Sequence, residues 1–141
     1  MSAVLSRHFA SGIALLTGLL LTHSGCGEAK RVATIPVTGT VSFKGAPVAD
    51  AYVVFLPASG PRATGTTDAT GRFQLMTTNP SDGAVAWEHV VLVEKSEPAN
   101  ANDPYAKRKA IIPPAYGNPQ ESPLRQKVAA GGTNDFKIEI Q

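Results

Sequence analysis

Cys26 is the residue of this sequence whose side chain and position most clearly point to covalent chemistry. It is the only cysteine among 141 residues, and it directly follows the stretch LLLTHSG. Without a second cysteine it has no partner for a disulfide within the chain. A thiol placed directly after an apolar run can instead accept another covalent group, and the preceding segment indicates which one.

The residues before this cysteine have the order of a secretory signal peptide. The first nine include one basic residue, Arg7, and no acid, while Ala10–Leu21 carries no charge. That apolar stretch is shorter than the ~20 residues that a membrane-spanning helix needs. Ser24 and Gly25 are small, as a peptidase requires at its cleavage point. We therefore predict that residues 1–25 are a signal peptide.

The segment from Leu21 to Cys26 resembles the lipobox of bacterial lipoproteins, in which the thiol is acylated and the cysteine becomes the new N-terminus. His23 stands where the usual pattern has leucine. The resemblance implies two or three acyl chains on Cys26, which anchor a protein stably where a single chain is marginal. Residues 26–35 would then be a lipidated tether. The alternative is an ordinary signal peptide whose removal leaves a free thiol.

The expected partner is thus a membrane, reached through lipid on Cys26. Gly27 follows, where an aspartate often retains lipoproteins at the inner membrane. The resemblance therefore implies an exported protein anchored at the outer membrane or cell surface of a bacterium. The formal net charge is only +2. Because non-specific nucleic-acid binding needs a dense basic face, we expect no nucleic-acid partner.

Catalysis and metal binding have little support in the remaining residues. After removal of residues 1–25 the one histidine left is His89, whose phase places it beside Val91 and Val93 as a satisfied, partly buried ring. No His, Cys or carboxylate cluster has the spacing of metal ligands. Asp68–Gly71 lacks the downstream acid of a calcium loop and is better explained as a hairpin turn. We expect no enzymatic activity, no cofactor and no metal.

Three aromatic residues and one basic run are candidates for ligand contacts. Trp87, Tyr105 and Tyr116 could form a sugar-stacking surface, although each is also explained by a structural role. Lys107–Lys109 reads KRK and could contact lipid headgroups or acidic polysaccharide, or form a solvated loop face. An envelope glycan or protein partner therefore stays open.

The elements that must position these residues are short strands separated by glycine- and proline-containing turns. We expect strands over 36–43, 50–57, 62–67, 72–77, 87–94, 126–132 and 134–140. The run 87–94 is apolar on both faces, with Trp87 and His89 on one face, and this predicts a central strand. The segment from Lys95 to Arg125 has no clear period and is expected to be a long loop.

Several segments together resemble the carboxypeptidase regulatory-like domain of small bacterial lipoproteins. Gly39 to Ala51 follows the pattern G-x-V-x-x-x-G-x-P-V-x-x-A, and Tyr116 to Leu124 follows Y-x-x-P-x-x-S-P-L. The likeness extends over the segments VTGTVSFKGAPVADAYVVFLP, GTTDATGRFQL, SDGAVAWEHVVLV, IPPAYGNPQESPL and NDFKIEI. It implies an all-β fold over residues 36–141, a seven-stranded antiparallel prealbumin-like sandwich related to immunoglobulin-like folds.

That family has no known catalytic activity, so the resemblance implies a non-enzymatic, lipid-anchored envelope protein that displays a small β-sandwich for structural or binding purposes. The alternative is a carbohydrate- or peptidoglycan-binding module. A transthyretin-like hydrolase shares the general fold, but that family ends in Tyr-Arg-Gly-Ser and uses several histidines. This chain ends FKIEIQ, which disfavours that class.

Overall fold

The computed structural model describes residues 32–103 and 105–141, so the predicted signal peptide, Cys26 and most of the tether lie outside the described residues. The described part is all-β, with one short 3-10 helix and no α-helix. The elements are β1 (Thr38–Phe43), β2 (Ala46–Pro47), β3 (Tyr52–Pro57), β4 (Ala63–Thr66), β5 (Arg72–Gln74), β6 (Glu88–Glu94), β7 (Ser96–Pro98), β8 (Arg108–Ala110), η1 (Pro114–Gly117), β9 (Arg125–Lys127) and β10 (Asp135–Ile140).

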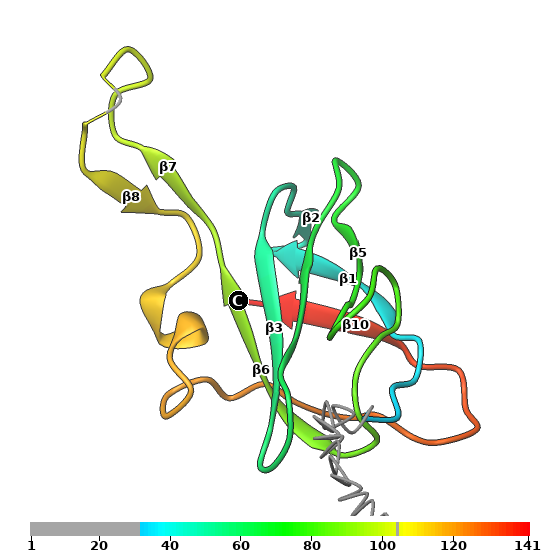
Figure 1. Ribbon diagram of the computed structural model, residues 1–141. Helices are drawn as coiled ribbons and strands as arrows, with labels where there is room; N and C mark the ends of the chain where they lie inside the picture. The colour runs from blue at the N-terminus through cyan, green and yellow to red at the C-terminus, as the bar shows by residue number, and fades with distance from the viewer. Residues whose placement is uncertain (1–31, 104) are drawn as a thin grey trace, which may run out of the picture. The chain divides into compact units, whose positions relative to one another are not determined.

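Two four-stranded sheets and one two-stranded ribbon make up the described fold (Figure 1). In the first sheet β1 is central and pairs with β10, β2 and β5, and the second has the order β4-β3-β6-β9. The ribbon pairs β7 with β8. The predicted central position of β6 is confirmed. The described residues hold ten strands, five of them only two or three residues long, so the predicted count of seven is not confirmed.

The core lies where the inner faces of the two sheets meet, with Phe55 between them. Ala51, Val53 and Phe55, on one face of the strand expected over 50–57, are all fully buried, and Val54 on the other face is 9% exposed. The ring of Phe55 lies 6.2 Å from that of Phe73 and 5.8 Å from that of Phe136, which belong to β5 and β10 of the opposite sheet. Tilted aromatic contacts of this kind join the two sheets.

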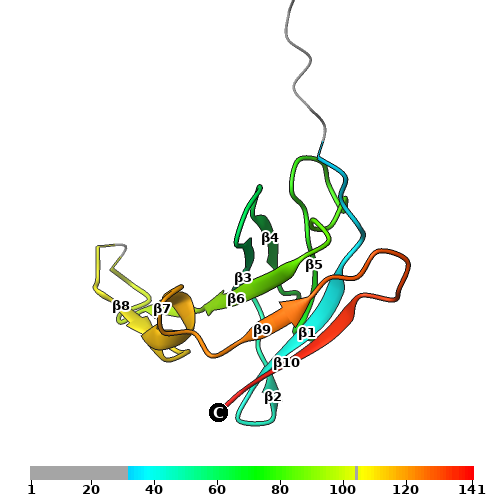
Figure 2. The same ribbon diagram turned by 90° about the horizontal axis from the view of Figure 1, so that it is seen from below.

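The pairing of β1 with β10 corrects the prediction of a purely antiparallel sandwich. The two strands run side by side and parallel, from Thr38 opposite Asp135 to Phe43 opposite Ile140 (Figure 2). Both start at the same end because the segment after β9 crosses from one sheet to the other. Asn134 holds this crossing, since its side chain exchanges hydrogen bonds with the backbone of Ala129 at 3.0 and 3.1 Å.

The turns predicted at glycines are confirmed. Gly45 and Gly71 have φ angles of +80° and +79°, which an L side chain rarely adopts. In the second turn the Asp68 carboxylate accepts hydrogen bonds from Thr70 and from the Arg72 N–H. The Thr70 hydroxyl first, and these backbone donors next, hold the pKa of Asp68 below its ordinary value. This confirms the hairpin-turn interpretation of Asp68–Gly71.

The segment from Lys95 to Arg125, predicted to be a long loop, contains β7, β8, η1 and the start of β9. Its ribbon forms through paired backbone groups rather than through buried alternating residues, because β8 is exposed throughout. Hydrophobic periodicity therefore could not reveal it. In Figure 1 the ribbon projects away from the two sheets.

Asp82 organises the segment between β5 and β6. Its carboxylate accepts hydrogen bonds from the N–H groups of Thr77, Thr78 and Asn79 at 2.6, 3.0 and 2.8 Å. Partial burial on its own raises the pKa of Asp82, but these donors outweigh it and the net pKa lies below the ordinary value. The carboxylate is therefore stabilised in its charged form by the folded chain.

We predict that Asp82→Asn lowers the free energy of unfolding at pH 7 by about 1 kcal/mol, because the neutral amide accepts these bonds less strongly. Because the pKa of Asp82 is lower in the folded than in the unfolded chain, the carboxylate stabilises the folded protein at pH values above the unfolded pKa of ~3.9. This stabilisation is lost as the pH falls through the pKa of the folded state. The deficit of the variant should thus shrink in urea unfolding at pH 3. Glu139→Gln, at an exposed position of β10, controls for loss of one charge. A deficit that is the same at both pH values would contradict this role.

Candidate functional site

The β7–β8 ribbon continues the line of β6 beyond the two sheets. Only Lys95 separates the end of β6 from the start of β7. The carbonyl oxygen of Lys95 accepts a hydrogen bond from the Ile111 N–H at 2.8 Å, which closes the base of the ribbon. Ala99 donates to the carbonyl oxygen of Lys107 near its tip. We call residues 96–110 the arm.

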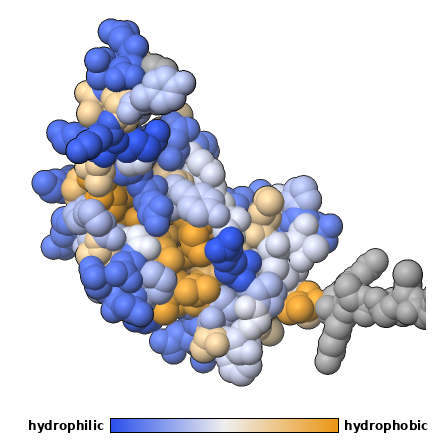
Figure 3. Space-filling view, turned by 60° about the vertical axis from the view of Figure 1, so that its left-hand side comes forward, coloured by the Kyte–Doolittle hydropathy of each residue, from blue (hydrophilic) through white to orange (hydrophobic). Residues whose placement is uncertain are grey.

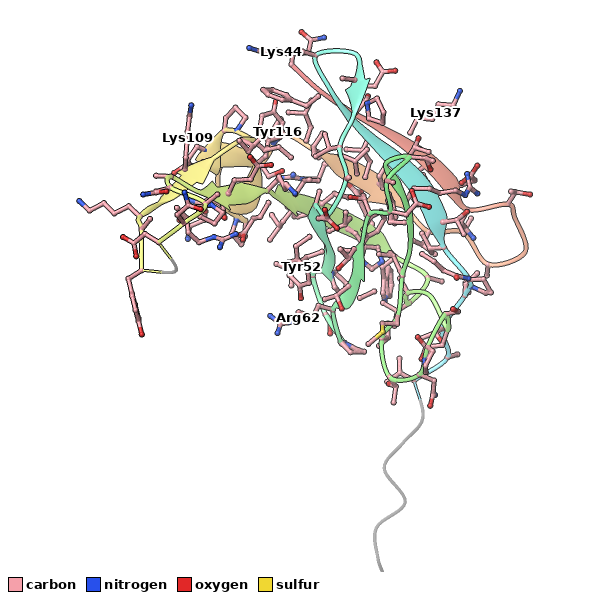
Figure 4. All side chains as sticks on the ribbon, turned by 90° about the horizontal axis from the view of Figure 1, so that it is seen from above. Lys44, Tyr52, Arg62, Lys109, Tyr116 and Lys137 are labelled. Atoms are coloured by element: carbon pink, nitrogen blue, oxygen red, sulfur yellow. The ribbon has the colours of Figure 1, made fainter. Side chains whose placement is uncertain are left out.

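The predicted basic run lies on the second strand of the arm. Arg108 is used within the arm: Nε donates to Ser96 Oγ at 2.8 Å and Nη2 to the Ser96 carbonyl oxygen at 2.6 Å. Lys109 lies opposite Glu97 in the strand register. Figure 4 shows Lys109 pointing outward from the arm. Arg108 is thus bound within the arm and Lys109 faces an acidic residue, so the basic run does not form a dense basic surface.

A cleft of about 420 Å³ opens at the base of the arm. Its apolar lining includes Ile112, Pro113 and Pro114, and polar groups come from Glu94 and Asn118. The volume falls within the range of small-ligand sites, which are mostly apolar with a few polar groups. This base cleft can hold an apolar group that ends in a hydrogen-bonding function.

Gly117 shapes one wall of the base cleft. A Cβ atom at this position would meet Glu94 Cγ at 2.7 Å and Glu94 Oε1 at 2.8 Å. Glycine therefore lets η1 approach the Glu94 side chain closely. The wall depends on this absence of a side chain.

Lys95 is the least exposed charged group of the arm region, with 15% of its side chain accessible. Its Nζ lies 3.6 Å from Asp50 Oδ2 and 3.9 Å from Glu97 Oε1. Both distances exceed a good hydrogen bond, so the ammonium group is held mainly by charge. Lys95 lines the base cleft and a second cleft of about 380 Å³ next to Phe43 and Asp50.

The outer face of the second sheet is apolar beside the arm. Val54 lies opposite Leu92, and Leu56 opposite Val90, in the β3–β6 register. Leu92 is 8% exposed, and Val90 is half-buried. Figure 3 shows apolar surface on this side, below the hydrophilic arm. The prediction that the β6 strand is apolar on both faces is therefore confirmed.

The three candidate aromatic residues do not share one surface. Tyr105 is 94% exposed near the tip of the arm, whereas Tyr116 in η1 packs against the core. Trp87 precedes β6 and is 63% exposed, so its predicted place on the strand beside His89 is wrong. The strand begins at Glu88, and the alternation does not extend back to Trp87.

His89 is fully buried, so the prediction of a partly buried ring is wrong in degree. Its Nε2 lies 2.9 Å from the carbonyl oxygen of Val85, which assigns the proton to Nε2. Its ring centroid is 5.6 Å from that of Phe55. Nδ1 has no hydrogen-bond partner in the described part of the chain, so the ring is only half satisfied. A ring in this position packs against Phe55 in the core.

Across 32–103 and 105–141, no group of three or more His, Cys, Asp or Glu side chains could hold a metal ion. No helix in these two ranges has the length and apolar character needed to cross a bilayer.

Lys95 and the base cleft are the features that sequence reasoning missed. The signal was present but weak: a lysine directly after the apolar run VVLVE, followed by two prolines at 113 and 114. Nothing in that spacing shows that residues 93–96 and 112–119 face one another. Only the pairing of β7 with β8, which folds the chain back on itself, brings them together.

Comparisons with known proteins add little. No family model matches the chain, and no curated protein matches it. Among solved structures, a 9R-lipoxygenase from Cyanothece PCC8801 is similar, with 14% sequence identity and a TM-score of 0.37. The likeness covers 77% of this chain and 16% of the lipoxygenase chain. A likeness this loose carries no argument about fold or activity.

We predict that Arg108→Ala loosens the arm, because an isolated two-stranded ribbon is marginal in water and Arg108 supplies two contacts to Ser96. Amide hydrogen exchange over residues 96–110 should speed up several-fold, with the sheets unchanged. Lys109→Ala is the matched control, since it removes a cation from the same strand and leaves both Arg108 contacts in place. Equal exchange rates in the two variants would show that Arg108 does not hold the arm.

Proposed function

We propose that this chain is a non-enzymatic, lipid-anchored protein of a bacterial cell envelope. It displays a carboxypeptidase regulatory-like domain of the prealbumin-like type, held close to a membrane through lipid on Cys26. The observation that carries the proposal is the position of the only cysteine, directly after a signal-like segment. The start of the sandwich supports it, because Ile35 already pairs with Ala84. At ~3.3–3.6 Å per residue, the tether from Cys26 to Ile35 reaches about 30 Å.

A binding role is supported by the arm and base cleft. The base cleft has the volume of a ligand site, and its polar groups Glu94 and Asn118 are suited to orienting a ligand rather than to transforming it. The one histidine of the described residues lies in the core against Phe55. Its burial favours a structural role for that ring.

We predict that the wild type incorporates labelled palmitate and partitions into the detergent phase of a phase-separation extraction, and that Cys26→Ala abolishes the labelling. The reason is that the thioether and the new N-terminus both require this cysteine. His23→Leu, which restores the usual lipobox residue, should be labelled at least as strongly as wild type. Labelling that is equal in wild type and Cys26→Ala, or absent in wild type, would contradict the proposed lipid anchor.

A second candidate function is binding of envelope glycan, and it is favoured by one observation. Tyr105 is 94% exposed near the tip of the arm, where a ring has no packing role. Exposed aromatic faces suit the CH groups of sugars.

We predict for this candidate that Tyr105→Ala weakens retention on purified peptidoglycan roughly 2- to 12-fold, the equivalent of ~0.5–1.5 kcal/mol for one aromatic contact. Tyr52→Ala is the control, because Tyr52 is 43% exposed and lies at the start of β3. Tyr116 is unsuitable, since it packs against the core. Failure of the wild type to bind peptidoglycan or any other envelope glycan would end this candidate.

A further inference from the structure

Large exposed apolar side chains gather at the end of the sandwich where the described chain starts. Five such side chains are exposed among the described residues, and three of them are Val32, Met76 and Trp87, at 51%, 48% and 63% exposure. We call these three residues the N-terminal rim. Exposed apolar residues that occur singly are ordinary in proteins. The three rim residues need an explanation because they occur at the same end of the sandwich.

Backbone pairing fixes that location. Ile35, three residues after Val32, forms a bridge with Ala84, three residues before Trp87. Leu75 donates its N–H to the carbonyl oxygen of Val37, so Met76 lies beside the same incoming segment. Each rim residue is thus within three residues of a backbone contact to 35–37. Three residues of chain span at most about 10 Å, so each rim residue lies within about that distance of a backbone contact to 35–37.

The other two exposed side chains lie elsewhere. Tyr52 is opposite Glu94, at the far end of β6 from Trp87. Tyr105 belongs to the arm, which follows that far end. The run from Glu88 to Pro98 spans up to about 35 Å at ~3.3 Å per residue. The rim and the arm therefore mark opposite ends of the β6–β7 line, as Figure 1 shows for the labelled strands.

We propose that the N-terminal rim is a membrane-docking surface that rests on the lipid bilayer to which Cys26 is anchored. This inference rests on the proposed function, because Cys26 supplies the anchor. Val32 is six residues after Cys26, so the tether holds the rim within about 20 Å of the anchored chains. No other end of the sandwich is kept so close.

The residue types of the rim suit a bilayer surface. Tryptophan concentrates at membrane–water interfaces, where its ring is apolar and its N–H stays in a polar layer. Methionine is flexible and adapts to irregular apolar surroundings. Such contacts are weak alone, but a short tether gives an effective concentration in the millimolar range, so a weak contact is occupied.

The acids nearest to the rim do not oppose docking strongly. Asp82 is engaged by the N–H groups of Thr77, Thr78 and Asn79. Glu88 lies opposite Lys127 in the β6–β9 register. Asp82 stays charged while its oxygens accept backbone hydrogen bonds, Glu88 has a lysine opposite it, and docking rests on the apolar side chains.

Trp87 reports directly on this surface, because it is the only tryptophan in the chain. The experiment uses protein extracted from membranes and reconstituted into phosphatidylethanolamine–phosphatidylglycerol vesicles, with part of the lipid brominated near the headgroup end of the acyl chains. Docking predicts a blue shift of the tryptophan emission, quenching by the brominated lipid, and protection from acrylamide relative to the Cys26→Ala protein without vesicles.

Two variants that keep the probe sharpen the test. Met76→Ser should reduce quenching by brominated lipid, because it makes the rim polar at an exposed position. Tyr52→Ser is the matched control, with 43% exposure against 48% for Met76, and should leave quenching unchanged. Equal loss in both variants, or no loss in either, would overturn the assignment of this end.

Failure of the docking surface and failure of the anchor give different results. If the protein floats with vesicles and carries acyl mass, but Trp87 stays open to acrylamide and is not quenched by brominated lipid, the inference is wrong and the proposed function stands. If no acyl mass is found, the proposed function fails. Coupling the Cys26 thiol to a maleimide phospholipid then supplies the anchor, and the same Trp87 readout still decides whether the rim docks.

Discussion

The contact of Phe55 with both sheets is the constraint on which the rest of the structure depends. Its ring touches Phe73 and Phe136 across the core and His89 within its own sheet. Gly39 lies opposite both Phe73 and Phe136 in the first sheet, and a Cβ atom there would overlap the ring of Phe73 and the carbonyl oxygen of Phe136. Its missing side chain leaves room for the Phe73 ring on this sheet, against which Phe55 packs from the other sheet. Among the described residues, Nδ1 of His89 has no hydrogen-bond partner at this packing centre.

This centre also aligns the elements that face outward. β3 and β6 pair over six residues, from Tyr52 opposite Glu94 to Pro57 opposite His89. Because β6 is held along this length, the chain that continues into β7 leaves the sheet in a defined direction. Lys95 stands at the point of departure, with acids from before β3 and from β7 on either side. The base cleft is a consequence of that turn in direction.

Sequence reasoning succeeded where one residue type decides the local structure. One face of β3 and one face of β10 are buried, and Gly45 and Gly71 adopt the positive φ angles expected of turn glycines. The central strand expected at 87–94 is β6, and the strand expected over 126–132 is the shorter β9 at the edge of its sheet. In each case the signal is local, since period and turn chemistry need only neighbouring residues.

Sequence reasoning failed where contacts between distant segments decide the structure. The parallel pairing of β1 with β10 joins the two ends of the domain, and nothing in either strand encodes the direction of its partner. The arm carries no apolar alternation, because its order comes from backbone pairing and from Arg108. Trp87 is in phase with His89 in the sequence, yet the strand starts one residue later and the ring is exposed. The base cleft forms where residues 93–96 meet residues 112–119, and the spacing of these segments in the sequence does not show that they meet.

The N-terminal rim and the arm lie at opposite ends of the β6–β7 line, so a contact at the rim would also orient the arm. The proposed lipid anchor on Cys26 would confine the domain near a membrane surface without orienting it. An arm on a freely rotating domain would face the bilayer as often as the space beyond it. A second weak contact at the tethered end removes that freedom at little cost in free energy, since the tether has already restricted translation. Trp87 directly precedes β6, and Tyr105 lies in the arm that continues beyond the other end of β6. Holding one near lipid therefore directs the other away from it.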